Sequence, residues 1–309
     1  MSSKIYKYFS PSVLGLVFSK YGFCSIKCSL PKDYNDPYEL FLGVDLSVPS
    51  SMLAAYREIV QEIPQHPTSC FSKSPIVTPM WAHYANNHSG FVVEFDVESL
   101  KVEFEKLIIK DVCYRSEPSE VIANHLQMAV GTKKPRHAYF LQQAVMSTAY
   151  FSKDISWGYE QECRLLEQEG RCENISGNQI LHIPVNCCSA IIVGNNADAK
   201  TVEQTKKIAK ETSLIWFESI IGKSMGQPFL ASIDGSRALF NGIGILAADK
   251  VCKSCSEPID DKNELCAWCS ITEAQMLSAA QGNPLRMLDH YGLLDNYYEG
   301  LNRIGRGKD

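Results

Sequence analysis

Four cysteines near the C-terminus have the spacing of a metal site. Cys252 and Cys255 form one C-x-x-C pair, and Cys266 and Cys269 form a second after ten intervening residues. Each pair can turn two thiolates towards one ion, and four thiolates are a ligand set of structural Zn²⁺. Such a site has no open position for a substrate. We therefore expect Zn²⁺ to hold this segment folded and not to take part in catalysis.

A second group of reactive side chains lies in WGYEQECRLL, residues 157–166. Glu160, Glu162 and Arg164 occupy alternate positions, so a strand would place all three on one face. The opposite face would enter the core with Tyr159, Cys163 and Leu165. A neighbouring guanidinium keeps carboxylates ionised, as a cleft-lining strand requires. A solvated strand face with an ion pair has the same pattern and is the alternative.

Polar and aromatic side chains also gather in WAHYANNHSGF, residues 81–91. A short helix ending before Gly90 would carry four of them: Trp81, His83, Tyr84 and His88. The histidines suit metal ligation, proton transfer or ligand contact, and a core or capping role is the alternative for each. Upstream, Asn-Asp-Pro at residues 35–37 predicts a rigid turn with Glu39 just beyond it.

The elements around these motifs predict an α+β fold. Short strands, including 157–167 and the apolar run 189–194, interleave with helices over 51–63, 117–150 and 198–212. The order lacks regular β-α-β alternation, which favours a mixed or split β-sheet with flanking helices over a doubly wound parallel sheet. Four segments are predicted along the chain: an α+β domain (1–230), a linker (231–250), a small zinc ribbon (251–271) and a C-terminal helical tail (272–309).

The composition is that of an ordinary globular protein, with 45% hydrophobic residues and a net charge of −5. This charge excludes a global basic field for nucleic acid, although a local patch remains compatible with it. The N-terminus lacks the apolar core of a signal peptide, and no run reaches the roughly 18 apolar residues of a membrane helix. We therefore predict a cytoplasmic protein without membrane contact, in which the other eight cysteines are free thiols.

Several motifs occur in a characteristic order: KYF, NDPYE, CFS, W-x-H-Y-A-x-x-H-x-G-F and W-x-Y-E-x-E-x-R. Over residues 4–220 this order resembles a bacterial family, the domain of unknown function numbered 2971. That family is similar at the fold level to ADP-ribosyltransferases, in which a split sheet grips NAD. The cysteine cluster and the tail lie beyond the region of resemblance.

The resemblance implies roles for individual residues. Glu162 or Glu160 would orient the ribose and stabilise an oxocarbenium-like transition state, and Arg164 would bind the pyrophosphate or hold Glu162. The remaining NAD contacts would come from an early-strand residue (Lys7 or Tyr8), from stacking aromatics (Trp81 or Tyr84) and from His83 and His88. Cys70-Phe71-Ser72 would take the place of the central Ser-Thr-Ser strand.

Three functions follow as hypotheses. The first is an ADP-ribosyltransferase-like enzyme acting on NAD, a toxin or anti-phage effector whose zinc ribbon binds a protein or nucleic-acid target. The second is a non-catalytic protein that binds a partner through the zinc ribbon and the C-terminal helices. The third is a metal-dependent nuclease using His83, His88, Glu160 and Glu162.

Overall fold

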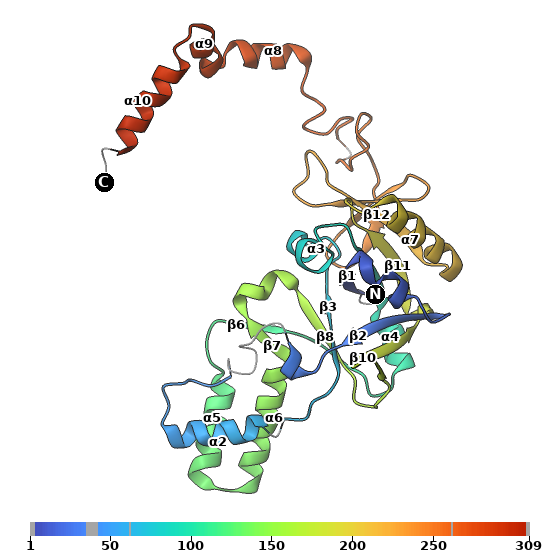
Figure 1. Ribbon diagram of the computed structural model, residues 1–309, viewed down its shortest axis with the longest axis vertical. Helices are drawn as coiled ribbons and strands as arrows, with labels where there is room; N and C mark the ends of the chain where they lie inside the picture. Colours follow the sequence, from blue (N-terminus) through green and yellow to red (C-terminus); the bar gives the residue numbers. More distant parts are fainter. Residues whose placement is uncertain (1–3, 35–42, 62, 261, 307–309) are drawn as a thin grey trace. The chain divides into compact units, whose positions relative to one another are not determined.

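The computed structural model describes residues 4–34, 43–61, 63–260 and 262–306. The chain divides into a larger unit, residues 1–247, and a C-terminal unit, residues 248–309. Helices and strands are mixed in the larger unit, which confirms the predicted α+β class (Figure 1). The turn predicted at Asn35-Asp36-Pro37, with Glu39 beyond it, lies outside the described residues.

A ten-stranded sheet forms the centre of the larger unit, in the order β15-β14-β13-β12-β11-β4-β1-β3-β8-β5. Among the described pairings of this sheet only β11 with β12 is parallel, so the sheet is mixed, as predicted. The strands are β1 (Lys4–Phe9), β3 (Thr68–Ser72), β4 (Phe91–Asp96), β5 (Ile108–Asp111), β8 (Glu162–Leu166), β11 (Cys188–Val193), β12 (Ile215–Ile220), β13 (Phe229–Ser232), β14 (Arg237–Phe240) and β15 (Ile245–Ala247).

The sheet is split between β1 and β3. β1 pairs with β4 along its whole length, but it pairs with β3 only where Tyr6 lies opposite Ser72. Beyond β3, the strands β8 and β5 continue the sheet through regular antiparallel ladders. The two parts of the sheet therefore diverge on either side of a single pairing, which leaves room between them.

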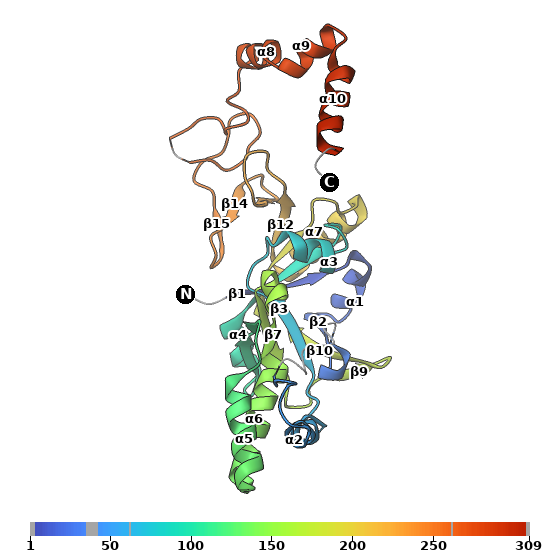
Figure 2. The ribbon, with the colours of Figure 1, turned by 90° about the vertical axis from the view of Figure 1, so that its left-hand side faces the viewer.

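Two smaller sheets and several helices complete the larger unit (Figure 2). β2 (Phe23–Cys28), β10 (Asn178–Pro184) and β9 (Glu173–Ile175) form one sheet, and β6 (Cys113–Arg115) pairs with β7 (Ser152–Asp154) in the other. The helices are α1 (Leu14–Val17), α2 (Ser50–Gln61), α3 (Thr78–Tyr84), α4 (Val97–Glu103), α5 (Glu120–Thr132), α6 (Pro135–Phe151) and α7 (Ala199–Thr212). The 3-10 turns are η1 (Pro11–Val13), η2 (Pro31–Asp33), η3 (Ile155–Glu160) and η4 (Val185–Cys187).

Local sequence explains where these elements begin. β4 and β11 are rich in apolar residues and are buried on both faces, as the central strands of a covered sheet must be. Asp198 caps α7 by accepting a hydrogen bond from the backbone N–H of Thr201. Pro135 starts α6 at its first turn, where the missing N–H costs nothing. Gly90 precedes β4 because a Cβ there would collide with the carbonyl oxygen of Phe9.

The predicted linker at 231–250 is wrong for most of its length. It contains the end of β13 and all of β14 and β15, which pair in order at the edge of the large sheet. These strands have only three or four residues each, and the connecting turns are rich in glycine, asparagine and aspartate. Short strands between such turns resemble a flexible segment in composition, although Asp-Gly and Asn-Gly are also hairpin signals.

The C-terminal unit consists of the cysteine-bearing loops followed by α8 (Glu273–Gln281), α9 (Pro284–His290) and α10 (Leu294–Arg306). The tail is therefore helical, as predicted. Thr272 and Gln275 form a capping box that starts α8. No described helix of the chain is both long and apolar enough to cross a membrane.

Candidate functional site

A cavity of about 190 Å³ opens where the sheet splits. Its walls come from the strands β1, β2, β3 and β8, from the helix α3, from the end of the turn η2, and from the segment that leads into β8. In the register of the sheet, Tyr6 lies opposite Ser72, and Ser72 lies opposite Glu162. Directly paired residues share one face of a sheet, so these three form a row across β1, β3 and β8 at the cavity.

Buried charges form the wall contributed by β8. Glu160, Glu162, Arg164 and Lys153 are each at most 5% exposed. Lys153 Nζ lies 2.7 Å from Glu160 Oε2 and 3.4 Å from Glu162 Oε2, so one ammonium group serves both carboxylates. Tyr84 Oη donates a hydrogen bond of 2.6 Å to the other oxygen of Glu160. Both carboxylates are therefore compensated although they are almost fully removed from water.

Arg164 is fully engaged. Its Nε donates to Glu162 Oε1 at 2.7 Å and its Nη2 donates to Oε2 at 3.2 Å, which is a bidentate pair. Its Nη1 donates to the carbonyl oxygen of Tyr150 at 2.8 Å, and its guanidinium lies 4.8 Å from the ring centre of Tyr34. This geometry gives Arg164 the task of holding Glu162 in place, and it leaves little of the guanidinium for a ligand.

The charges around Glu162 decide its protonation state. Burial alone would raise the pKa of this carboxyl, but the charge and hydrogen bonds of Arg164, with Lys153, outweigh burial and lower the pKa to about 2. Cys70 borders the same carboxylate; although the residue as a whole is exposed, the desolvation of its thiol and the charge of Glu162 raise the pKa of that thiol to about 12. Glu162 is therefore an anion and Cys70 a neutral thiol at physiological pH.

The depressed pKa predicts an acid-sensitive contribution to stability. Because the folded pKa lies below the ordinary value of 4.5, the stabilisation is complete above about pH 5 and is lost as pH falls towards 2. The shift corresponds to about 3 kcal/mol of unfolding free energy. Urea unfolding of wild type and of Glu162→Gln between pH 7 and 3 measures it, since other groups cancel in the difference. A difference that stays constant with pH would contradict the assignment.

The strand predicted over 157–167 begins later than expected. Residues Ile155–Glu160 form the 3-10 turn η3, Gln161 has a left-handed backbone, and β8 starts only at Glu162. Glu162 and Arg164 share a strand face as predicted, whereas Glu160 reaches the cavity from the turn. Cys163 and Leu165 enter the main core, as expected. Tyr159 does not join them, because it precedes the strand and packs with a different core cluster.

The predicted NAD-contacting residues separate into two groups. Lys7, Tyr8 and Tyr84 line the cavity. Three others are not among the lining residues: Trp81, His83 and His88. Trp81 is fully buried, with its Nε1 donating to the carbonyl oxygen of Pro75 at 2.8 Å, and it offers no surface to a ligand. His88 stacks on that indole, 5.9 Å between ring centres, and His83 is exposed.

The residues proposed for a nuclease do not form a metal site. Within the described part of the chain, the four C-terminal cysteines are the only group of three or more His, Cys, Asp or Glu side chains placed to share an ion. His83 and His88 therefore do not join Glu160 and Glu162 as metal ligands. The geometry gives this third hypothesis no support.

Sequence reasoning missed Lys153, Tyr34 and Lys27, all of which line the cavity. Lys153 stands seven residues before Glu160 in the short strand β7, outside any motif. Tyr34 and Lys27 come from segments that meet β8 only through the tertiary fold. Cys70, which the resemblance placed in a central strand with Phe71 and Ser72, lies in β3 opposite Arg164 and lines the cavity.

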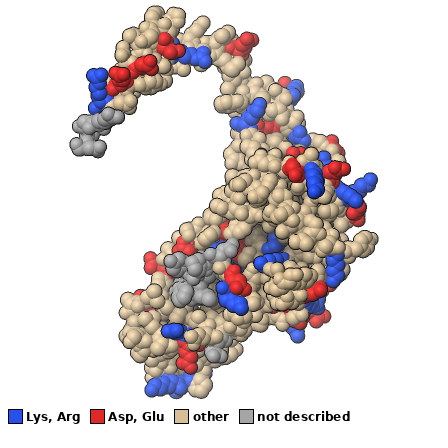
Figure 3. Space-filling model, in the orientation of Figure 1, with Lys and Arg blue, Asp and Glu red and all other residues tan. Residues whose placement is uncertain are grey.

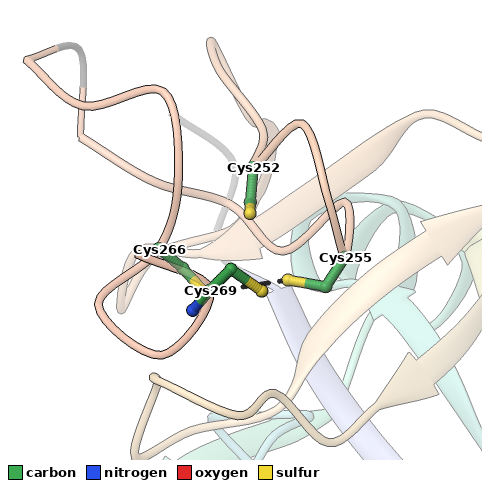
Figure 4. Close-up of side chains that lie close together, drawn as sticks. All are labelled: Cys252, Cys255, Cys266 and Cys269. Atoms are coloured by element: carbon green, nitrogen blue, oxygen red, sulfur yellow. Dashed lines mark hydrogen bonds between the residues drawn. The ribbon is translucent and has the colours of Figure 1, made fainter. Parts of the chain in front are cut away.

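The four C-terminal cysteines converge as their spacing predicts (Figure 4). Their Sγ atoms all lie within 4.8 Å of one another, and those of Cys255 and Cys266 are 3.7 Å apart. A tetrahedral ion with metal–sulfur bonds of about 2.3 Å separates its sulfurs by about 3.8 Å. The backbone N–H of Cys269 donates to Cys266 Sγ at 3.3 Å. The donor set and its geometry therefore fit one metal ion.

Comparison with known proteins finds a match for part of the chain. A family model described as "Protein of unknown function (DUF2971)" matches residues 80–165. This stretch contains the WAHYANNHSGF motif and six of the 17 residues that line the cavity, among them Glu160, Glu162 and Arg164. No curated protein and no solved structure matches the chain.

Proposed function

We propose that the larger unit cleaves the N-glycosidic bond of NAD and transfers ADP-ribose to an acceptor. The observation that carries the proposal is Glu162, an ionised carboxylate fixed in a cavity at the split of the sheet, in one row with Tyr6 and Ser72. Cleavage of this bond builds positive charge on the ribose. A fixed carboxylate stabilises that charge without reorganising in the transition state.

The neighbouring groups have supporting roles in this reaction. Arg164 and Lys153 hold the carboxylate of Glu162 in one orientation, which is the preorganisation that such stabilisation requires. Glu160 lies on the same wall and would accept the proton of the attacking acceptor or water. Tyr84 keeps one Glu160 oxygen in place through its 2.6 Å hydrogen bond.

The size of the cavity indicates how NAD would lie. Sites that enclose a drug-sized ligand have volumes of about 300–1,000 Å³. The volume here is about 190 Å³, so only the nicotinamide end would be enclosed and the rest would extend outward. Lys7 and Lys27 line the cavity, and no described carboxylate lies within ion-pair distance of either ammonium group. These two lysines would therefore bind the pyrophosphate, a role that the resemblance had implied for Arg164.

The decisive experiment is nicotinamide release from NAD by metal-loaded protein, with cell lysate as acceptor. We expect Glu162→Gln to lower the rate by about a hundredfold or more, as loss of one preorganised charge does. Glu211→Gln, which changes an exposed glutamate on α7, is the matched control. Unfolding curves of each variant exclude misfolding as the cause. Wild-type protein that neither binds nor cleaves NAD would refute the function, and an active Glu162→Gln would refute the role of this residue.

For the C-terminal unit we propose structural Zn²⁺ and a role in binding a protein or nucleic-acid target. Four thiolates at tetrahedral spacing suit Zn²⁺ better than the oxygen-preferring divalent ions. Acidic and basic side chains are interspersed over the visible surface, with no large patch of one sign (Figure 3). An enzyme that consumes NAD in the cytoplasm and is directed to a target would act as a toxin or an anti-phage effector.

A non-catalytic binding protein is the second candidate. It is favoured by the C-terminal helices, because α8 and α9 bury none of their own residues. Large apolar side chains are exposed there, among them Met276, Leu277 and Met287. Exposed apolar residues of this kind are typical of surfaces that bind another protein. Full biological activity of residues 1–247 alone would exclude this candidate.

A further inference from the structure

The turn between α5 and α6 concentrates positive charge. Residues 121–153, which include all of α6 and almost all of α5, contain no Asp or Glu. Three cations lie at the turn, Lys133, Lys134 and Arg136, and all three residues are exposed. No described acidic side chain lies within ion-pair distance of them. The turn forms the end of the helical pair, away from the large sheet (Figure 1).

These cations occupy positions at which local structure favours other residues. Lys133 has a left-handed backbone with a φ of 51°, where glycine or asparagine is preferred. Lys134 is the N-cap of α6, and its side chain makes no capping hydrogen bond, as Ser, Asp or Asn would. Arg136 lies in the first turn of α6, where the helix dipole favours acidic residues. The C-terminus of α5 favours a cation at Lys133, but helix stability does not account for Lys134 or Arg136.

The positive groups at the turn also act on one another. Arg136 Nε donates a hydrogen bond to His137 Nε2 at 3.3 Å, so the imidazole accepts as a neutral group and leaves the charge of Arg136 uncancelled. Desolvation lowers the pKa of His137, and the charges of Arg136, Lys134 and His125 lower it further. α2, which packs on both helices, adds one cation and one anion that offset each other. The turn therefore has a positive potential that favours an anionic partner.

Aromatic rings lie next to these cations. Tyr139 and Phe140 are 57% and 49% exposed, and their ring centres are 6.0 Å apart. They follow Arg136 by three and four positions on α6, and residues at this spacing share one face of a helix. The ring of His125 on α5 lies 6.1 Å from that of Phe140. Exposed rings beside cations bind single-stranded nucleic acid, because bases stack on the rings while phosphates pair with the cations.

The positions of the charges and rings favour a single strand over other polyanions. A segment that enters a lipid surface does so with its apolar residues. Here the cations occupy the end of the helical pair, and the rings lie one turn behind them on the side of α6. A duplex offers phosphates but keeps its bases stacked inside, so it leaves the rings of Tyr139 and Phe140 without a partner.

We propose that the α5–α6 turn binds single-stranded nucleic acid, with phosphates at the three cations and unstacked bases on the rings of Tyr139 and Phe140. RNA and DNA share this chemistry, and the test below distinguishes them. None of these residues lines the cavity at the split of the sheet or belongs to the cysteine-bearing loops. The site therefore stands whether or not the protein cleaves NAD.

The test measures binding of labelled oligo(U), oligo(dT) and a DNA duplex to the full-length, metal-loaded protein by fluorescence anisotropy. Wild type should bind a single strand more tightly than the duplex, and the tighter of the two homopolymers identifies the sugar. With three phosphate contacts, the logarithm of Kd should rise with the logarithm of salt concentration with a slope of about 2.

Two double variants separate the charge of the turn from the charge of the whole protein. Lys134→Ser with Arg136→Gln should lower the salt slope to about 0.7 and weaken binding about tenfold or more. Its Tm should be unchanged or higher, because both new residues suit the start of a helix better than the cations do. Lys200→Gln with Lys210→Gln removes the same charge from exposed positions on α7 and should bind as wild type does.

A third double variant, Tyr139→Leu with Phe140→Leu, tests the rings. It should weaken single-strand binding about fivefold or more without changing the salt slope, since it removes stacking and no charge. Single-strand binding that survives the change at Lys134 and Arg136 would place the site elsewhere, on the cysteine-bearing loops or on α7, and would overturn the proposal.

The choice of partner has its own contrary outcomes. Wild-type protein that binds no single strand at low salt, or binds the duplex equally well, would overturn the proposal. A preference for phosphatidylserine vesicles or for polyglutamate over both homopolymers would also overturn it, in favour of a membrane surface or an acidic protein.

Discussion

Chelation of the metal is expected to unfold the cysteine-bearing loops while the larger unit stays folded. In the described part of residues 248–309 the buried side chains are those of Cys252, Glu257, Pro258 and Cys266, so no apolar core can replace the ion. Structural zinc contributes about 10–16 kcal/mol in small modules of this kind. Loss of the ion is therefore expected to remove more stabilising free energy than the whole free energy of unfolding of such loops.

Hydrogen exchange measures this effect residue by residue. The amides of Cys252, Ser256 and Ser270 donate to backbone oxygens within the loops, at 2.8–3.0 Å. They should lose protection with EDTA and regain it with Zn²⁺, while amides of β4 remain protected. Cys255→Ser should reproduce the loss without chelator, and Cys113→Ser, an exposed cysteine outside the cluster, should not. Loops that stay equally protected in EDTA would show that the fold does not depend on a metal.

Replacing Arg164 by methionine is expected to destabilise the larger unit by about 3–5 kcal/mol. The change removes the bidentate partner of Glu162, whose side chain is only 3% exposed, and leaves its charge in a low-dielectric site with Lys153 alone. Truncation of one partner of a buried pair costs more than the pair itself contributes, because the remaining charge stays uncompensated. Thermal unfolding should show a fall in Tm of about 10 °C.

Two further variants separate this effect from loss of packing. In Arg164→Met with Glu162→Gln no unpaired charge remains, so much of the lost stability should return. Arg171→Met removes a partly exposed partner of Glu169 and should cost less than about 1 kcal/mol. A double variant as unstable as Arg164→Met alone would mean that packing of the guanidinium, and not charge compensation, dominates.

The sequence predicted local features well. The C-x-x-C pairs need only short-range geometry, and the amphipathic pattern of α7 with its Asp198 cap is complete within one segment. Glu162 and Arg164 share a face because β8 is a regular strand there. Glu160 lies on the same wall although it is not part of the strand. The left-handed backbone of Gln161 turns the chain just before β8, and the alternation of strand residues does not predict this turn.

Other features depended on contacts that one sequence does not reveal. The cation shared by Glu160 and Glu162 comes from β7, and the cation–π partner of Arg164, Tyr34, is 130 positions away in the chain. The sequence suggested that Trp81 and His88 bind a ligand, but their rings stack on each other. Burial of the large apolar indole in the core is more favourable in free energy than its exposure in a solvated site. In the segment that contains β14 and β15, the Asp-Gly and Asn-Gly turn signals predict the structure better than the loop-like composition does.

The split of the sheet also constrains the order in which the cavity can form during synthesis of the chain. β1 must wait for β4, about 85 residues later, and β3 must wait for β8, about 95 residues later. Glu160, Glu162 and Arg164 leave the ribosome after every other segment of the cavity wall. A nascent chain shorter than this lacks the charged wall, so ribosomes that stall early release fragments in which the cavity is incomplete.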